Sequence, residues 1–142
     1  MSAATIEILL VEDNKDDAAL TVRALARARL GNQVHVATTG AEALAFLRHQ
    51  PPYETAPRPD LVLLDLDLPG VDGRTVLEQI KGDEQLRAVP VIVVSGSLNP
   101  ADVERAYRLH ANAYVAKPIE PKAFLEAVRS IEEFWLQVVT LP

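Results

Sequence analysis

The stretch VLLDLDLPG, residues 62–70, carries an unbroken run of apolar side chains into two aspartates and a Pro-Gly turn. An apolar run without polar alternation is typical of a strand buried on both faces of a parallel sheet. Asp65 and Asp67 would then lie at the carboxyl end of that strand, where an unpaired carboxylate is costly to bury. The stretch therefore predicts an α/β fold with a polar site at one edge of its sheet.

Similar runs recur along the chain, each followed by a helical signal. The expected strands are IEILLV (6–11), QVHVAT (33–38), DLVLLDL (60–66), VPVIVVSG (89–96) and NAYVAK (112–117). QVHVAT alternates apolar and polar residues, which suits an edge strand with one face in solvent. Five alternating strand–helix units predict a doubly wound parallel sheet with right-handed crossovers.

The helices are expected to begin at recognisable caps and to bury one apolar face each. The predicted starts are Asn14 with Asp17 behind it, Thr39 or Gly40, Asn99-Pro100, and Pro121. The predicted buried positions are Ala18, Val22 and Leu25 in the first helix, Ala43, Phe46 and Leu47 in the second, Val76, Leu77 and Ile80 in the third, and Phe124, Val128, Ile131 and Trp135 in the fifth.

The segment HQPPYETAPRP, 49–59, interrupts this regular pattern and carries four of the ten prolines in the chain. Prolines at this density exclude a regular helix and favour an extended surface connection. A loop that contacts a partner is the alternative.

Composition sets the broad class. The chain has 142 residues, a net charge of −6 and no cysteine, so we expect a single domain over 1–142 without disulfides or thiolate metal sites. An acidic balance argues against direct nucleic-acid binding, because phosphate contacts need Lys and Arg. There is no membrane-spanning apolar stretch and no basic signal-peptide start, which predicts a cytoplasmic protein without membrane contact.

Polar side chains follow four of the predicted strands, at the edge where an open α/β sheet binds ligands. They are Glu12-Asp13, Asp65 with Asp67, Ser95, and Lys117-Pro118. Crowded carboxylates repel one another, and a hard divalent cation such as Mg²⁺ removes that conflict. With an ammonium and a hydroxyl beside it, such a site suits a phosphoryl group, which an aspartate accepts as an acyl phosphate.

The motif DLDLPG after an apolar strand resembles the nucleophile motif of haloacid-dehalogenase-type phosphatases. That family places its nucleophile near the start of the fold and its acidic metal-binding pair after the lysine. Here the acidic pair Glu12-Asp13 comes first, and the chain has no room for a cap domain. The phosphatase is therefore the weaker of two resemblances.

The order acidic pair, aspartate, hydroxyl, aromatic and Lys-Pro is similar to the receiver domain of two-component response regulators. The resemblance runs through ILLVEDN (8–14), LVLLDLDLPGVDG (61–73), VIVVSG (91–96) and AYVAKP (113–118), which is nearly the whole chain. It implies a flavodoxin-like (βα)₅ sandwich with sheet order 2-1-3-4-5. It also implies a phosphoacceptor signalling protein rather than an enzyme, with only weak self-phosphorylation and autodephosphorylation.

The resemblance implies that Asp65 is the phosphoacceptor and that Mg²⁺ is the cofactor. Asp13, Asp65 and the backbone carbonyl of Asp67 would bind the ion directly, and Glu12 would act through water. Asp67 stands where many members have a neutral or apolar residue. A carboxylate at that position would repel an anionic donor or position a hydrolytic water.

The resemblance also implies a switch. Ser95 and Lys117 would contact the phosphoryl oxygens, and the ring of Tyr114 would turn inward when Ser95 moves. The Lys117-Pro118 bond is expected to be cis. The output face would be formed by the fourth helix, the fifth strand and the fifth helix.

The implied partner is a sensor histidine kinase, and a histidine phosphotransfer protein is a further candidate. No helix-turn-helix or basic region follows the expected fifth helix, so we expect no direct contact with nucleic acid. The ending IEEFWLQVVTLP, the insertion 49–59 and the segment NPADVERAY resemble single-domain regulators paired with bacterial phytochrome kinases.

The apolar run at about 134–142, with Phe134, Trp135 and Leu136, is longer than one helical face requires. Large apolar patches usually mark interfaces, so we expect a homodimer through this end. The alternative is that the run packs back on the sheet.

A degenerate receiver, acting as a phosphorylation-independent binding module, is a further alternative. Such proteins usually lack an acid, the hydroxyl or the lysine. This sequence has lost none of them.

Overall fold

The computed structural model describes residues 6–27, 32–68, 70, 72–97 and 99–131, and within them five parallel strands alternate with five helices. The elements are β1 (Ile6–Val11), α1 (Lys15–Arg27), β2 (Asn32–Ala37), α2 (Gly40–Leu47), β3 (Leu61–Asp65), α3 (Gly73–Gly82), β4 (Val91–Ser95), α4 (Pro100–Arg108), β5 (Ala113–Ala116) and α5 (Pro121–Arg129). The strand order is β2-β1-β3-β4-β5, and every pairing is parallel. This confirms the predicted doubly wound, flavodoxin-like fold.

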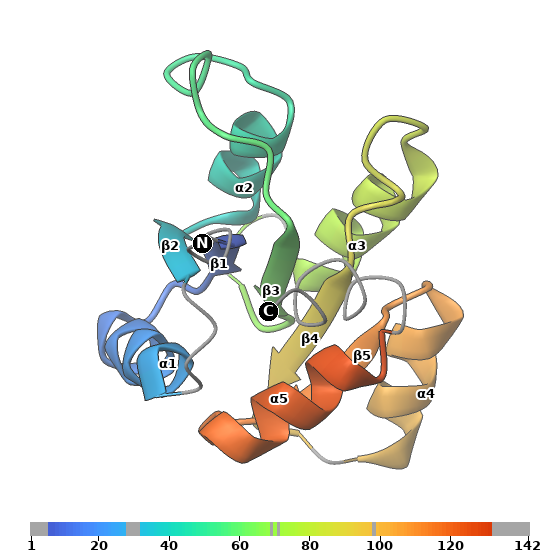
Figure 1. The fold of residues 1–142 in the computed structure, drawn as a ribbon. Helices are drawn as coiled ribbons and strands as arrows, with labels where there is room; N and C mark the ends of the chain where they lie inside the picture. The colour runs from blue at the N-terminus through green and yellow to red at the C-terminus, as the bar shows by residue number, and fades with distance from the viewer. Residues whose placement is uncertain (1–5, 28–31, 69, 71, 98, 132–142) are drawn as a thin grey trace.

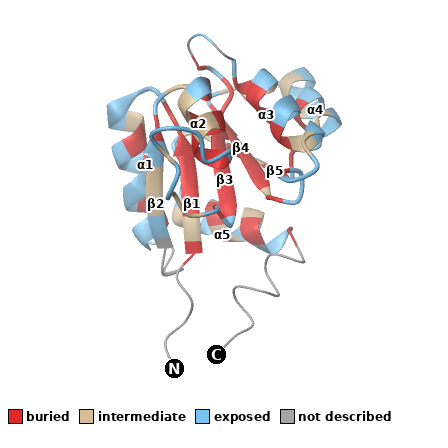
Figure 2. Cartoon of the chain, turned by 90° about the horizontal axis from the view of Figure 1, so that it is seen from above, coloured by how far each residue is buried: buried red, intermediate tan, exposed pale blue. Residues whose placement is uncertain are grey.

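The sheet lies between two layers of helices (Figure 1). Alternate residues of β1 show why its sequence is apolar throughout: Ile8 and Leu10 pack with α1 and α5, whereas Leu9 and Val11 pack with α2 and α3. The central strands are consequently buried along their length (Figure 2). No helix in the described ranges is both long and apolar enough to cross a bilayer.

The predicted caps are present at three helix starts. The Asp17 amide donates to Asn14 Oδ1 at 2.9 Å, and the Glu42 amide donates to Thr39 Oγ1 at 3.1 Å. At α4 the side chain of Asn99 caps the helix, and Pro100 follows at its first position. Each cap satisfies an amide that has no partner within the helix.

The structure corrects the predicted buried face of α1. Val22 is 37% exposed, while Thr21 and Ala24 are buried beside the expected Ala18 and Leu25. The helix is rotated so that the stripe of residues 18, 21, 24 and 25 is buried and Val22 lies outside it. Ile131 is buried as predicted, but Trp135 lies outside the described residues, as do Phe134 and Leu136.

The edge position predicted for QVHVAT is correct, but its solvent-facing pattern is not as expected. Val36 is 46% exposed, whereas the polar His35 is half-buried and its Nε2 lies 3.1 Å from Glu7 Oε1. The imidazole also lies against the ring of Phe46 on α2. A polar partner and an aromatic contact therefore bury the residue that alternation assigned to solvent.

The proline-rich segment 49–59 has no helix, as predicted, but it does not run extended. Two successive turns close with hydrogen bonds from the Tyr53 amide to Gln50 O and from the Ala56 amide to Tyr53 O. The ring of Tyr53 packs on Phe46 with centroids 5.4 Å apart. The segment is thus a compact loop anchored to α2.

Candidate functional site at the carboxyl edge of the sheet

Parallel strands bring their carboxyl ends to one edge, and buried polar side chains gather there. Within the described chain the fully buried polar side chains are Glu12, Thr21, Asp65 and Ser95, and three of these four stand where β1, β3 and β4 end. Burying polar groups costs free energy unless partners compensate. Their position at one edge therefore marks a site.

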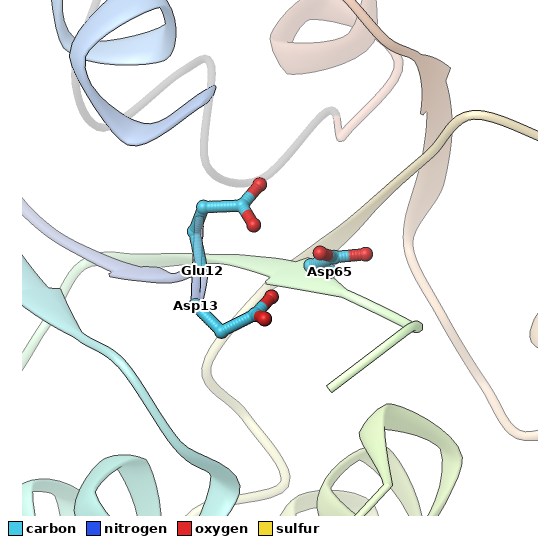
Figure 3. A group of neighbouring side chains, drawn as sticks. All are labelled: Glu12, Asp13 and Asp65. Carbon is cyan, nitrogen blue, oxygen red and sulfur yellow. The ribbon is translucent and has the colours of Figure 1, made fainter. Parts of the chain in front are cut away.

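Three carboxylates converge at the ends of β1 and β3 (Figure 3). Glu12, Asp13 and Asp65 each offer an oxygen, and these oxygens all lie within 4.8 Å of one another. Asp67 is exposed and is not part of this carboxylate cluster. Its amide instead donates to Asp65 Oδ1 at 3.0 Å, which fixes the orientation of the Asp65 carboxylate.

Lys117, directly after β5, supplies the positive charge of the site. Its Nζ lies 2.6 Å from Glu12 Oε1 and 3.0 Å from Asp65 Oδ2. A third carboxylate, that of Asp17 on α1, lies at 3.3 Å. The Lys117 amide donates to Ser95 O, and the Lys117-Pro118 bond is cis, as the resemblance implied.

Burial and charge act in opposite directions on the ionisable groups. Burial raises the pKa of Glu12, and the nearby Asp65 charge adds to this, against hydrogen bonds from Lys117 and the Asn14 amide. Burial alone would lower the pKa of Lys117, but its contacts with Glu12 and Asp65 outweigh burial and raise it. The site holds one ammonium and four carboxylates, three in contact with Lys117 and the fourth, Asp13, in the carboxylate cluster. It therefore carries an excess of negative charge that favours a divalent cation.

Gly73 allows α3 to close over the end of β3. A Cβ at this position would lie 2.4 Å from Asp65 O and 2.5 Å from Leu66 Cα, distances that real Cβ atoms do not adopt. Only glycine therefore brings the first turn of α3 against the backbone of Asp65. Sequence reasoning gave Gly73 no role, although the motif LVLLDLDLPGVDG contains it.

The two predicted switch residues meet at Ser97. Ser95 Oγ accepts from the Ser97 amide at 3.1 Å, and the Tyr114 hydroxyl donates to Ser97 O at 2.9 Å. Tyr114 is half-buried between these contacts and the core. The sequence placed Ser97 at the end of the fourth strand and Asp17 behind a helix cap, but it did not predict their contacts with Tyr114 and Lys117, because those partners lie far away along the chain.

Comparison with known proteins identifies the family of this architecture. Residues 8–129 match the response regulator receiver domain. Response regulator Rcp1 of Synechocystis is 44% identical over 135 residues, which is 95% of this chain and 92% of that protein. The Mn²⁺-bound form of Rcp1 superposes with a TM-score of 0.76 at 44% identity, over 96% of this chain and 99% of that chain.

Two further solved structures are similar over almost the full chain. The bacteriophytochrome response regulator AtBRR has a TM-score of 0.85 at 42% identity, covering 93% of this chain and 96% of that one. The phosphorylated cyanobacterial phytochrome response regulator RcpA has a TM-score of 0.79 at 46% identity, covering 98% and 99%. The chain belongs to the response regulator receiver domain family.

Proposed function

We propose that this protein is a response regulator in which Asp65 accepts a phosphoryl group from a sensor histidine kinase, in a Mg²⁺-dependent reaction. The observation that carries the proposal is the buried Asp65 carboxylate, held by Lys117 on one oxygen and by the Asp67 amide on the other. A fixed carboxylate with a neighbouring ammonium suits attack on phosphorus.

The carboxylate cluster fits a magnesium ion. Asp13 and Asp65 would bind it with the backbone carbonyl of Asp67, and Glu12 would act through water. When bound, Mg²⁺ neutralises charge on the phosphoryl oxygens. The cluster geometry and the Mn²⁺-bound structure of the relative Rcp1 support this assignment.

Asp65, Lys117 and Ser95 have different roles in the proposed phosphoryl transfer. An Asp65 oxygen forms the new bond to phosphorus as the bond between phosphorus and the donor nitrogen breaks. Lys117, already 3.0 Å from Asp65 Oδ2, offsets the negative charge that arrives. Ser95 turns its hydroxyl toward the phosphoryl oxygens.

Movement of Ser95 would carry the signal outward. Ser95 and Tyr114 both bond to Ser97, which precedes α4, so displacement of Ser95 would move the residue to which the Tyr114 hydroxyl is bonded. The surface that changes is α4, β5 and α5. Phosphorylation biases an existing equilibrium between the two arrangements rather than creating a new one.

The donor is proposed to be a phytochrome histidine kinase. The relatives AtBRR and RcpA, at 42% and 46% identity, are described as phytochrome response regulators. A cavity of about 290 Å³ lies beside the site and includes Asp17, Leu20 and Lys117 in its lining, which offers the donor an approach. A histidine phosphotransfer protein as a further partner and homodimerisation through 134–142 remain parts of the proposal.

The two alternatives have less support. The match of residues 8–129 to the receiver family leaves the phosphatase resemblance resting on the DLDLPG motif alone. A degenerate binding module has no reason to keep Asp65 buried against Lys117 with two further acids beside it.

Incubation with Mg²⁺ and acetyl phosphate, followed by intact mass measurement, tests the proposal. One hydroxylamine-labile phosphoryl adduct is expected in the wild type and in Asp60→Asn, a control at the opposite end of β3, and none in Asp65→Asn. An adduct that persists in Asp65→Asn would refute the assignment. Transfer from a phosphorylated phytochrome kinase, compared with an unrelated histidine kinase, tests the partner.

A further inference from the structure

The ammonium of Lys117 has as many carboxylate partners as it has N–H groups. An ammonium carries three N–H donors, and a carboxylate oxygen lies within reach of each. Nζ is 2.6 Å from Glu12 Oε1, 3.0 Å from Asp65 Oδ2 and 3.3 Å from Asp17 Oδ2. The single positive charge of Lys117 is therefore shared among three negative charges.

The three partners differ in burial and in their place in the site. The side chains of Glu12 and Asp65 are 2% and 4% exposed, and both belong to the carboxylate cluster. The side chain of Asp17 is 42% exposed, comes from α1 and is not part of that cluster. Asp17 and Lys117 both line the cavity of about 290 Å³ beside the site. Asp17 therefore holds Lys117 from the more exposed side of the site.

The contact between Lys117 and Asp17 is the one that can be given up at the least cost. A buried carboxylate that loses its ammonium is left without compensation for its lost hydration, which applies to Glu12 and Asp65. The exposed carboxylate of Asp17 can bond to water instead, so its pair with Lys117 stabilises the fold only weakly. The main effect of Asp17 therefore falls on the charge that Lys117 presents to the site.

A phosphoryl group on Asp65 adds a charge of roughly −1.5 to −2, which Lys117 helps to offset. The Asp17 carboxylate competes with the phosphoryl oxygens for the same ammonium and cancels part of its charge. We propose that Asp17 restrains Lys117 in this way and thereby slows the phosphorylation of Asp65 by small phosphodonors such as acetyl phosphate. The inference rests on the proposed phosphorylation of Asp65, and it makes Asp17 a positioning residue that acts through Lys117.

The test is the initial rate at which the intact protein gains one phosphoryl group in Mg²⁺ and acetyl phosphate, followed by mass. Asp17→Asn keeps the size of the side chain and removes its charge, and it is expected to react about twofold to fivefold faster than the wild type. Asp16→Asn is the matched control, because Asp16 is an exposed neighbour on α1 outside the three carboxylate contacts described for Lys117. Its rate is expected to match that of the wild type.

The same substitution in a Lys117→Met background shows whether Asp17 acts through Lys117. Without the ammonium there is nothing for Asp17 to restrain, so Asp17→Asn is expected to leave the slow rate of Lys117→Met unchanged. An equal acceleration in both backgrounds would mean that Asp17 only repels the anionic donor, and this result would overturn the proposal.

The direction of the change separates restraint from structural support, because loss of a supporting contact slows the reaction. If the wild type forms the adduct and Asp17→Asn is no faster, the restraint is refuted while the proposed function stands. If neither protein forms an adduct, the restraint and the proposed function both fail. An adduct that forms in Asp17→Asn but not in the wild type would support the restraint in its strongest form.

Discussion

Lys81 and Lys117 are both largely withdrawn from solvent, and each ammonium has three oxygen partners, yet their pKa values move in opposite directions. Lys81 on α3 donates to Arg87 O, Val89 O and Asn112 Oδ1, at 3.1, 2.9 and 2.9 Å. These acceptors are neutral, so burial lowers its pKa. Burial also acts to lower the pKa of Lys117, but the Glu12 and Asp65 carboxylates outweigh it and raise this pKa. The Asp17 carboxylate is the third oxygen partner of its ammonium.

The charge of the acceptors around a buried lysine decides whether that lysine stabilises the fold or forms part of a charged site. Neutral acceptors satisfy the donors of Lys81 and pin α3 to the start of β4, since Asn112 Oδ1 also accepts from the Val91 amide. Charged acceptors around Lys117 exceed its single charge. The remaining negative charge favours a divalent cation.

The largest expected effect is that of Lys117→Met on phosphorylation. Loss of the ammonium beside Asp65 removes a preorganised partner of the phosphoryl oxygens, which costs on the order of 100-fold in rate. Intact mass followed over time with Mg²⁺ and acetyl phosphate measures this. A rate within tenfold of the wild type would place Lys117 outside the chemistry.

Lys81→Met is expected to reverse that pattern. The Arg87 and Val89 carbonyls and the Asn112 amide lose a charged donor, so the free energy of unfolding should fall by about 1–3 kcal/mol. Phosphorylation by acetyl phosphate should stay within about twofold, because neutral acceptors build no anion site. Urea unfolding measures the free energy of unfolding, and the same mass assay measures the rate of phosphorylation. A large loss of rate with unchanged stability would contradict the structural role given to Lys81.

The raised pKa of Glu12 gives the site a pH dependence with a definite sign. Between the ordinary pKa of a glutamate and the raised one, the folded protein without metal holds the extra proton, so stability present below this window falls as pH rises through it. Protons compete with Mg²⁺, so Mg²⁺ affinity should increase with pH over the same window. Lys117, whose pKa is raised, keeps its charge throughout.

Titration of Mg²⁺ at several pH values from about 5 to 8 measures this dependence. Glu12→Gln cannot titrate there and should flatten the curve. A curve of equal slope in Glu12→Gln would assign the pH dependence to another group.

The smallest expected effect is that of Asp17→Asn. Its carboxylate is 42% exposed and lies 3.3 Å from Lys117, the longest of the three contacts. A pair this open to solvent is screened, so the free energy of unfolding should change by less than about 0.5 kcal/mol. Asp16→Asn, an exposed neighbour on α1, is the control for urea unfolding. A loss above 2 kcal/mol in Asp17→Asn alone would show that all three carboxylates hold Lys117 equally.

Local sequence signals sufficed for much of the fold. Continuous apolar runs identified strands because central parallel strands are buried on both faces, and β1 begins and ends at the predicted residues 6 and 11. Caps such as Thr39 and Asn99 marked helix starts because they bond to amides two or three residues away. The prediction that Val22 is buried was wrong, because the spacing of apolar residues indicates an apolar stripe along a helix but does not fix how the helix is rotated against the sheet.

The sequence by itself also determined which chemistry the sheet edge can hold, because the carboxyl ends of parallel strands lie at one edge. Asp65 and Ser95 end their strands, and Glu12 and Lys117 directly follow theirs. Only the tertiary structure decided which side chains on the helices contact residues far away along the chain. Asp17 is 100 residues from Lys117 along the chain, and Arg74 reaches Asp102 between helices. Such contacts depend on how helices pack and on a few side-chain torsions, and neither of these leaves a periodic trace in the sequence.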